Sequence, residues 1–138
     1  MKFDRRFFSN FLVFVLLIIV GIVISMCQAS NTVRLAFGDD VIAISSKDYR
    51  MNITYSNVES LELINEPNFG EVTDGKNRPE LKSGLWQNEE WGQYHLIYNP
   101  SSTGCIAVHM VNGDTYVFSN NTDKETAETY AEFLTHVN

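Results

Sequence analysis

The side chains best suited to metal binding or proton transfer are few and widely spaced in this chain. Its 138 residues include three histidines and two cysteines, and none of them forms an HxH, HxxxH or CxxC pattern. A protein metal site usually draws on closely spaced histidine, cysteine or carboxylate ligands. We therefore expect no metal site and no cofactor. We interpret the five residues as structural or surface groups: His95, His109, His136, Cys27 and Cys105.

Residues that could catalyse hydrolysis are equally scattered. Covalent catalysis needs an activated nucleophile beside a base, and the chain contains no G-x-S-x-G motif. The pairs Asp39-Asp40 and Glu89-Glu90 are poor catalytic dyads, because adjacent side chains point to opposite sides of an extended chain. We predict a protein that is not an enzyme. A hydrolase whose catalytic residues meet only in space remains a third class of function.

Two tryptophans, Trp86 and Trp91, are candidate partner-binding residues, because tryptophan is enriched at binding hot spots. They bracket the polar segment Gln-Asn-Glu-Glu. The alternative is structural: Trp86 would plug one end of a β-barrel and Trp91 would shield its rim. Both interpretations stay open at this stage.

The element that would place such residues at a membrane is the N-terminal segment. Residues 7–27 carry no charge, and the run is about as long as a helix that crosses a hydrocarbon core of roughly 30 Å. Lys2, Arg5 and Arg6 precede it, so the positive-inside bias predicts a cytoplasmic N-terminus in a single-pass cell-membrane protein. The expected parts are a cytoplasmic N-terminus, a transmembrane helix and an extracytoplasmic domain: residues 1–6, 7–28 and 31–138.

The alternatives to a retained anchor are a cleaved signal peptide and a lipoprotein signal. A cleavable signal peptide has an apolar region of about 7–15 residues, which is shorter than this run. Cleavage after Ala29 would place Cys27 and Ala29 at the small-residue positions. A lipoprotein signal has a small residue directly before the modified cysteine, whereas Met26 occupies that position here. We therefore favour the retained anchor.

Charge is divided unevenly along the chain. Residues 31–138 carry seven Lys/Arg against sixteen Asp/Glu, a net charge of −9, whereas residues 1–30 carry a net charge of +2. A domain this acidic is repelled by nucleic acid and by anionic lipid headgroups. Acidity also keeps a tethered domain soluble. We expect no nucleic-acid partner.

The pattern of the soluble part is typical of short β-strands. Residues 49–55 alternate apolar and polar side chains, as a half-buried strand does. Asn112-Gly113 lies between two apolar runs and predicts a β-hairpin. Residues 65–82 are rich in Gly, Pro, Asn and charge, which predicts a long loop. Together the apolar runs predict about seven strands.

The end of the chain changes to a helical period. Thr122-Asp-Lys-Glu125 is a capping box, in which a threonine hydroxyl and a glutamate satisfy the free amides of a helix start. The apolar positions that follow recur at helical spacing and predict one amphipathic helix: Ala127, Tyr130, Ala131, Leu134 and Val137, with Phe133 beside them.

Strands followed by one C-terminal helix resemble the order of a pleckstrin-homology (PH)-like barrel. The residues are similar to those of membrane-tethered bacterial PH-domain families over about residues 33–137. The similarity rests on four short segments: residues 53–63, residues 75–86, Gly92-x-Tyr94-x-Leu96, and the final hairpin from Ile106 to Ser119. The resemblance implies a mainly β fold: a seven-stranded PH-like barrel or sandwich, preceded by one transmembrane helix.

Within that resemblance, phosphoinositide binding is not carried over. Superfamily members that bind these lipids use basic residues around the first hairpin, whereas this chain has Gly38-Asp39-Asp40 there. The resemblance places the strand from Thr54 to Ile64 at an open sheet edge, where Glu59 and Glu62 would face a basic or polar partner segment. The alternative is that Glu59 and Glu62 only protect an exposed edge from aggregation.

The function favoured by the sequence is a non-catalytic, membrane-anchored extracytoplasmic module that binds or positions another cell-envelope protein. The alternative is a small-ligand or substrate-handling accessory domain of an envelope system. A pocket lined by convergent polar groups would favour the accessory domain, and an open sheet edge would favour the binding module.

Overall fold

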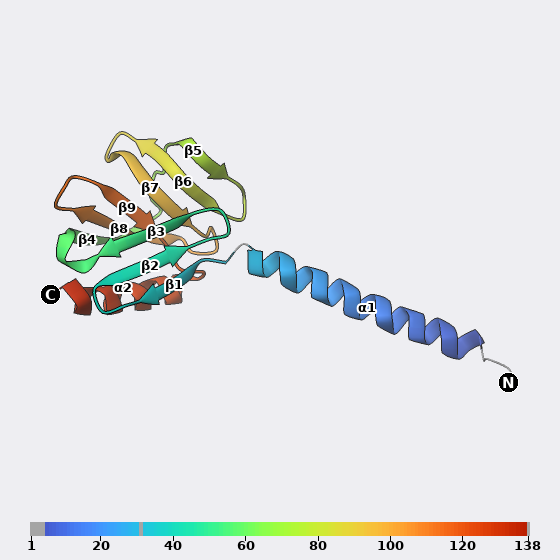
Figure 1. Cartoon of the computed structure of the whole chain (residues 1–138). Helices are drawn as coiled ribbons and strands as arrows, with labels where there is room; N and C mark the ends of the chain where they lie inside the picture. The colour runs from blue at the N-terminus through green and yellow to red at the C-terminus, as the bar shows by residue number, and fades with distance from the viewer. Residues whose placement is uncertain (1–4, 31, 138) are drawn as a thin grey trace. The chain divides into compact units, whose positions relative to one another are not determined.

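The computed structural model describes residues 5–30 and 32–137, and the side chains of residues 9–26 and 32–137. The chain divides into two compact units, residues 1–30 and 31–138. The described part of the first unit is a helix, and the described part of the second is a β-rich domain that ends in a helix (Figure 1). The prediction of a mainly β protein with an apolar N-terminal helix and a C-terminal helix is confirmed.

Helix α1 (Arg5–Ser30) contains an uncharged 18-residue stretch, Ser9–Met26, with a mean hydropathy of 2.7. At about 1.5 Å per residue, the whole helix is longer than a hydrocarbon core of roughly 30 Å. The apolar side chains of this stretch are all exposed in the protein itself. The chain therefore has one helix, within its described residues, that is long and apolar enough to span a membrane. A signal sequence has the same properties, so a retained anchor stays a prediction.

The domain contains two β-sheets joined by the 3-10 helix η1 (Tyr55–Asn57). The first sheet has the strand order β1-β2-β3, with bounds Arg34–Phe37, Val41–Ser45 and Arg50–Thr54. The second has the order β4-β8-β9-β7-β6-β5, with bounds in chain order Val58–Asn65, Glu71–Asn77, Lys82–Asn88, Gly92–Tyr98, Gly104–Met110 and Thr115–Phe118. Every pair is antiparallel except β7 with β9.

The described residues form nine strands rather than about seven, and the two sheets do not close into a barrel. The predicted loop at residues 65–82 was wrong, because it contains β5. All seven β5 residues are exposed, so the strand has no buried face to create an alternating pattern. At Gly84, φ is +99°, and a Cβ atom would lie 2.5 Å from the carbonyl oxygen of Asp74. Glycine thus permits the close approach of β5 and β6.

Hydrophobic residues cover both faces of the six-stranded sheet, because successive side chains of a strand point to opposite faces. On β8, Ile106 and Val108 belong to a cluster shared with the three-stranded sheet and α2. Cys105 and Ala107 belong to a second cluster on the other face, with Trp86 and aromatic residues of β7. Strand β8 is consequently buried along nearly its whole length.

Helix α2 (Asp123–Val137) begins as the capping box predicts, since the Glu125 N–H donates to Thr122 Oγ1 at 3.1 Å. Its buried face differs from the predicted one. Ala127 and Ala131 are exposed, and Leu134 lies outside the core cluster. The side chains that face the core are Thr126, Thr129 and Phe133, with Tyr130 and Val137 packed beside them.

Two core-facing threonines explain the error. The hydroxyl of Thr126 donates to the Thr122 carbonyl oxygen at 2.8 Å, and that of Thr129 to the Glu125 carbonyl oxygen at 2.7 Å. With their hydroxyls satisfied inside the helix, both side chains can be buried at little cost. A count of apolar residues alone misses such positions.

A polar network fastens the start of α2 to the loop between β7 and β8. One oxygen of Asp123, Oδ1, accepts hydrogen bonds from the Thr103 N–H at 2.6 Å, the Thr103 hydroxyl at 3.0 Å and the Gly104 N–H at 3.3 Å. Nearby, the Asn121 side chain both accepts from the Val33 N–H at 2.8 Å and donates to its carbonyl oxygen at 3.0 Å. Hydrogen bonds therefore fix the segment before β1 and the start of α2 at the same corner of the domain.

We expect this corner to make the domain sensitive to acid. The hydrogen bonds from Thr103 lower the pKa of Asp123 below the ordinary value of 3.8. A lowered folded-state pKa gives stability that is present above the unfolded-state pKa and is lost as the pH falls through the folded-state pKa. In urea unfolding from pH 6 to pH 2.5, Asp123→Asn should be less stable than wild type at pH 6, and the gap should shrink below about pH 4.

The matched control is Glu128→Gln on the exposed side of the same helix, which should follow the wild type throughout. A difference between Asp123→Asn and the wild type that is constant over the whole pH range would contradict a role for the Asp123 charge.

Candidate functional site

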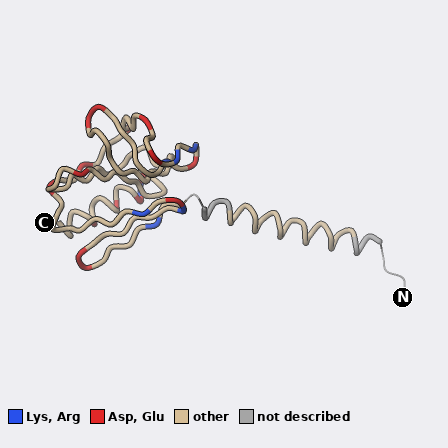
Figure 2. The backbone as a smooth tube through the Cα atoms, turned by 45° about the horizontal axis from the view of Figure 1, so that its top comes forward, with Lys and Arg blue, Asp and Glu red and all other residues tan. Residues whose placement is uncertain are grey.

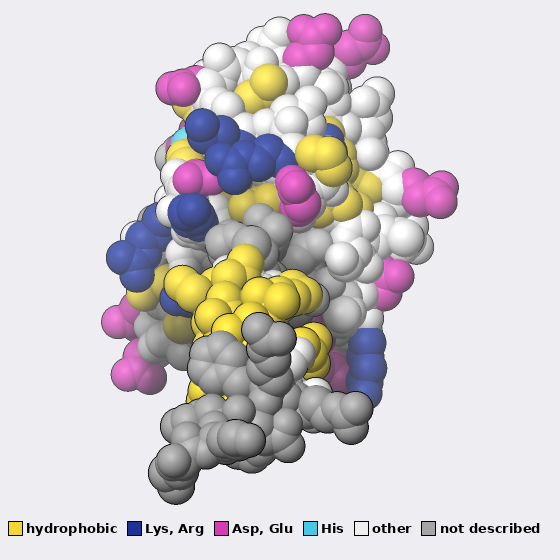
Figure 3. All heavy atoms as spheres, turned by 90° about the vertical axis from the view of Figure 1, so that its right-hand side faces the viewer, with side chains coloured by type: hydrophobic (Ala, Val, Ile, Leu, Met, Phe, Trp, Pro, Cys, Tyr) yellow, Lys and Arg dark blue, Asp and Glu magenta, His cyan; other side chains and the backbone are white. Residues whose placement is uncertain are grey.

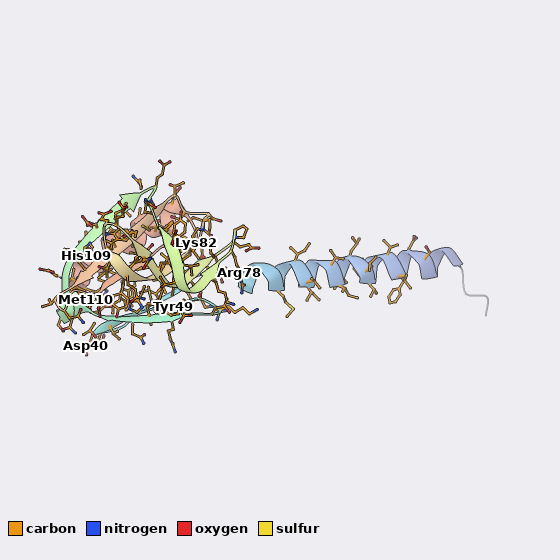
Figure 4. All side chains as sticks on the ribbon, turned by 90° about the horizontal axis from the view of Figure 1, so that it is seen from above. Asp40, Tyr49, Arg78, Lys82, His109 and Met110 are labelled. Carbon is orange, nitrogen blue, oxygen red and sulfur yellow. The ribbon has the colours of Figure 1, made fainter. Side chains whose placement is uncertain are left out.

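An open cleft of about 380 Å³ lies beside the free edge of β3, at the end of the domain that carries the β8–β9 hairpin. Met110 marks this end in Figure 4. The residues that line the cleft come from β3, η1 and the hairpin: Asn52, Thr54, Asn57, Met110, Val111, Asn112 and Tyr116.

One wall of the cleft is the edge of β3, which pairs with β2 alone among the described strands. The Tyr55 N–H donates to the Asp40 carbonyl oxygen at 3.0 Å, which fixes the direction of the backbone groups along the strand. In an antiparallel pair, successive residues direct their N–H and C=O groups alternately toward and away from the partner. The backbone groups of Asn52 and Thr54 therefore point away from β2, on the side of the cleft.

The opposite wall is the tight β8–β9 hairpin, which the Asn-Gly pair correctly predicted. The Gly113 N–H donates to the Met110 carbonyl oxygen at 3.0 Å, and Gly113 has a φ of +96°, which glycine adopts freely. The Val111 N–H donates to the Asn57 carbonyl oxygen at 2.9 Å. This bond joins the hairpin to η1 and holds the Val111 side chain 70% exposed beside the cleft.

A stack of rings holds Tyr116, the aromatic residue of the cleft. Its ring lies parallel to that of His95, with centroids 4.6 Å apart and an angle of 12° between the planes. His95 Nδ1 lies 2.6 Å from the Tyr49 hydroxyl oxygen. Burial lowers the pKa of His95 and raises the pKa of Tyr49, so the imidazole is neutral and the phenol keeps its proton at neutral pH. The stack is suited to positioning Tyr116.

Cys105, the cysteine of the domain, is unlike a reactive thiol. Cys105 is fully buried, and burial raises its pKa to about 12, so very little thiolate exists at neutral pH. Within the part of the chain that the structure describes, no three His, Cys, Asp or Glu side chains gather as metal ligands.

The two tryptophans lie away from the cleft. Trp86 is 1% exposed; its indole N–H donates to the Ser83 carbonyl oxygen at 3.1 Å, and the ammonium of Lys82 lies 5.2 Å from its ring centroid. Trp91 is half-buried and packs edge-on against Tyr94, with ring centroids 5.1 Å apart. Trp86 is therefore a core residue, whereas partner contact at Trp91 stays a prediction.

The two glutamates lie on β4, which is an edge strand of the six-stranded sheet, as expected. Glu62 Oε2 lies 3.0 Å from His109 Nε2, so this carboxylate already has a partner on β8. Glu59 is exposed beside an irregularity in the β4–β8 register. The structure does not bring Glu59, Glu62 and the tryptophans together into one site, and their partner contacts remain untested predictions.

Sequence reasoning missed the cleft because its walls are more than fifty residues apart in the chain. Asn52 and Thr54 are the polar positions of an alternating strand, and Val111 precedes a turn, so no local pattern marks them. Two larger surface hollows, of about 580 and 550 Å³, are lined in part by carboxylates: one by Glu71 and Glu89, the other by Asp39 and Asp40 together with Thr54.

Comparison with known proteins gives no relative of this chain: no family model, no curated protein and no solved structure matches it.

Proposed function

We propose that this protein is a non-catalytic, membrane-anchored extracytoplasmic module that binds another cell-envelope protein, and that an extended segment of that partner lies in the cleft beside β3. The observation that carries this proposal is the free edge of β3, where the backbone groups of Asn52 and Thr54 have no partner strand. A sheet edge of this kind can accept an added strand through main-chain hydrogen bonds.

The composition of the cleft defines the partner segment. Main-chain hydrogen bonds would supply affinity independent of sequence, and the amide side chains of Asn52 and Asn57 could bond further peptide groups. Val111 and Met110 offer an apolar contact at the hairpin. A neutral extended segment with one apolar residue fits these groups better than a highly charged segment does.

The chemistry of the described side chains supports binding over catalysis. The Cys105 thiol is buried, and the neutral His95 is held by Tyr49 and Tyr116. A nucleophile beside a base would be needed for a hydrolase. We therefore keep the proposal that the protein is not an enzyme, and that it binds neither nucleic acid nor phosphoinositide headgroups specifically.

The relationship to bacterial PH-like families remains part of the same proposal. It rests on the short segments quoted above, on two sheets and on a C-terminal helix. A solved structure of a PH-like relative with the same parallel pairing of β7 with β9 would support this relationship.

A small-ligand accessory domain is the second candidate, and one observation favours it. Three asparagine side chains and Thr54 line a single cleft whose volume lies in the lower part of the range of small-molecule sites, roughly 300–1,000 Å³. Such a ligand would occupy the cleft without adding a strand to β3.

Photo-crosslinking distinguishes the two candidates. We expect a photoreactive amino acid at Val111, in the full chain expressed in its native cells, to crosslink one envelope protein. The same group at Glu128, on the exposed side of α2, should not crosslink that protein. A protein crosslinked equally from both positions, or from neither, would contradict partner binding at the cleft. A small molecule bound to the purified chain and lost on Asn52→Ala would favour the accessory domain.

A further inference from the structure

Basic side chains gather at one end of an otherwise acidic domain. Six of its seven Lys/Arg residues come from the start of β1, the β2–β3 turn and the β5–β6 hairpin, together with the carboxylates of Asp48, Asp74 and Glu80. The seventh, Lys124, lies beside Asp123 at the start of α2, which Asn121 joins to Val33. Figure 2 shows the Lys and Arg segments concentrated at this end, and Figure 3 shows that face with its basic side chains exposed. The basic end is formed by Arg34, Lys47, Arg50, Lys76, Arg78 and Lys82.

Two loops build the basic end, and the structure fixes them together. Ser45 of β2 lies opposite both Arg34 of β1 and Arg50 of β3, so the two guanidinium groups flank one row of the sheet. The Arg78 guanidinium lies 3.3 Å from the Asp48 carboxylate, which joins the β5–β6 turn to the β2–β3 turn. Within the described residues, Arg34, Lys47, Arg50 and Lys76 form no ion pair.

The chain enters the domain at this same end. Arg34 is the fourth residue after Ser30, the last residue of α1. Four residues span at most about 14 Å, so a helix anchored in a bilayer keeps the basic end close to the lipid surface. A short tether also raises the effective concentration of the domain at that surface to the order of millimolar.

The remaining acidity of the domain does not oppose this contact strongly. A folded domain of about 100 residues has a radius of gyration of roughly 13 Å, so its far carboxylates lie on the order of 30 Å from the basic end. The Debye length is about 8 Å at physiological ionic strength. The lipid surface therefore senses mainly the nearby positive charges, although the net charge of the domain alone predicts repulsion.

We propose that the basic end docks on anionic lipid headgroups of the bilayer that holds α1, and so orients the domain. Figure 4 places Arg78 and Lys82 at one end of the domain and Met110, which lines the cleft, at the other. Docking leaves the cleft open to a partner. This contact is electrostatic and has no pocket for a headgroup. It rests on the membrane anchor of the proposed function.

Lysine footprinting of the full chain in nanodiscs tests the docking. With 30% anionic lipid, Lys47 and Lys76 should react with an acylating reagent roughly fivefold more slowly than in zwitterionic nanodiscs, since each basic residue near an anionic surface contributes about that factor. Raising the salt to 0.5 M should remove the protection, because the Debye length shortens.

Charge variants provide the matched comparison without touching the reporter lysines. The double variant Arg34→Gln/Arg50→Gln should restore the reactivity of Lys47 and Lys76, whereas Arg34→Lys/Arg50→Lys should keep them protected. Equal reactivity in the two lipids, or protection that resists salt, would overturn the proposal. Protection by a soluble anionic polymer but not by anionic lipid would assign the face to a polymer instead. A chain that does not copurify with nanodiscs would overturn the anchor and the docking together.

Discussion

Phe133→Ala should destabilise the isolated domain by about 3–5 kcal/mol, the range measured for truncation of a large buried aromatic side chain. Phe133 is fully buried and is the one apolar side chain of α2 that reaches the centre of the core. Its ring meets Phe37 at 6.3 Å and 84°, and Tyr55 at 5.9 Å and 81°. These edge-on contacts join α2 to the three-stranded sheet and to η1, so truncation leaves a cavity where three elements meet.

Urea unfolding of residues 32–138, followed by tryptophan fluorescence, measures this loss, because Trp86 is buried in the folded domain. Leu134→Ala is the matched control: the side chain is next in sequence but lies outside the core cluster, so its loss should cost about 1 kcal/mol or less. Equal losses for the two variants would mean that α2 docks through the face predicted from apolar residues alone.

The sequence predicted those elements whose signals are local. Alternation at residues 49–55 predicted β3, Asn112-Gly113 predicted the β8–β9 hairpin, and the capping box at Thr122 predicted the start of α2. Strand β5 was missed because none of its seven residues is buried. The parallel pairing of β7 with β9 was missed because strand order depends on long-range contacts, about which a local pattern is silent.

The candidate site was less predictable than the fold. Tryptophan and glutamate were chosen by residue type, yet Trp86 is a core residue and Glu62 is bonded to His109. The cleft instead lies beside a strand edge that has no neighbouring strand. Such a free edge can be recognised only in the assembled sheets. The basic end was hidden for a related reason, because a net charge carries no information about where charges lie.

The second large effect concerns the partner. Thr54→Pro should reduce crosslinking from position 111 at least tenfold, because proline removes the backbone N–H that Thr54 directs toward the cleft. Thr54 has a φ of −80°, which proline adopts without strain, and Ile53 before it is extended, as a residue before proline must be. The hydrogen bonds between β3 and β2 are kept, since Thr54 does not use its N–H there. The variant therefore removes one donor from the edge while preserving the fold.

Crosslinking from position 111 in the full chain, compared between Thr54→Pro and Thr54→Val, tests the central claim most directly. Thr54→Val removes the hydroxyl but keeps the N–H, so strand addition predicts that this variant retains the crosslinked partner while Thr54→Pro loses it. Circular dichroism should show the same folded domain in both. Equal crosslinking by the two variants would contradict partner binding through the backbone edge of β3.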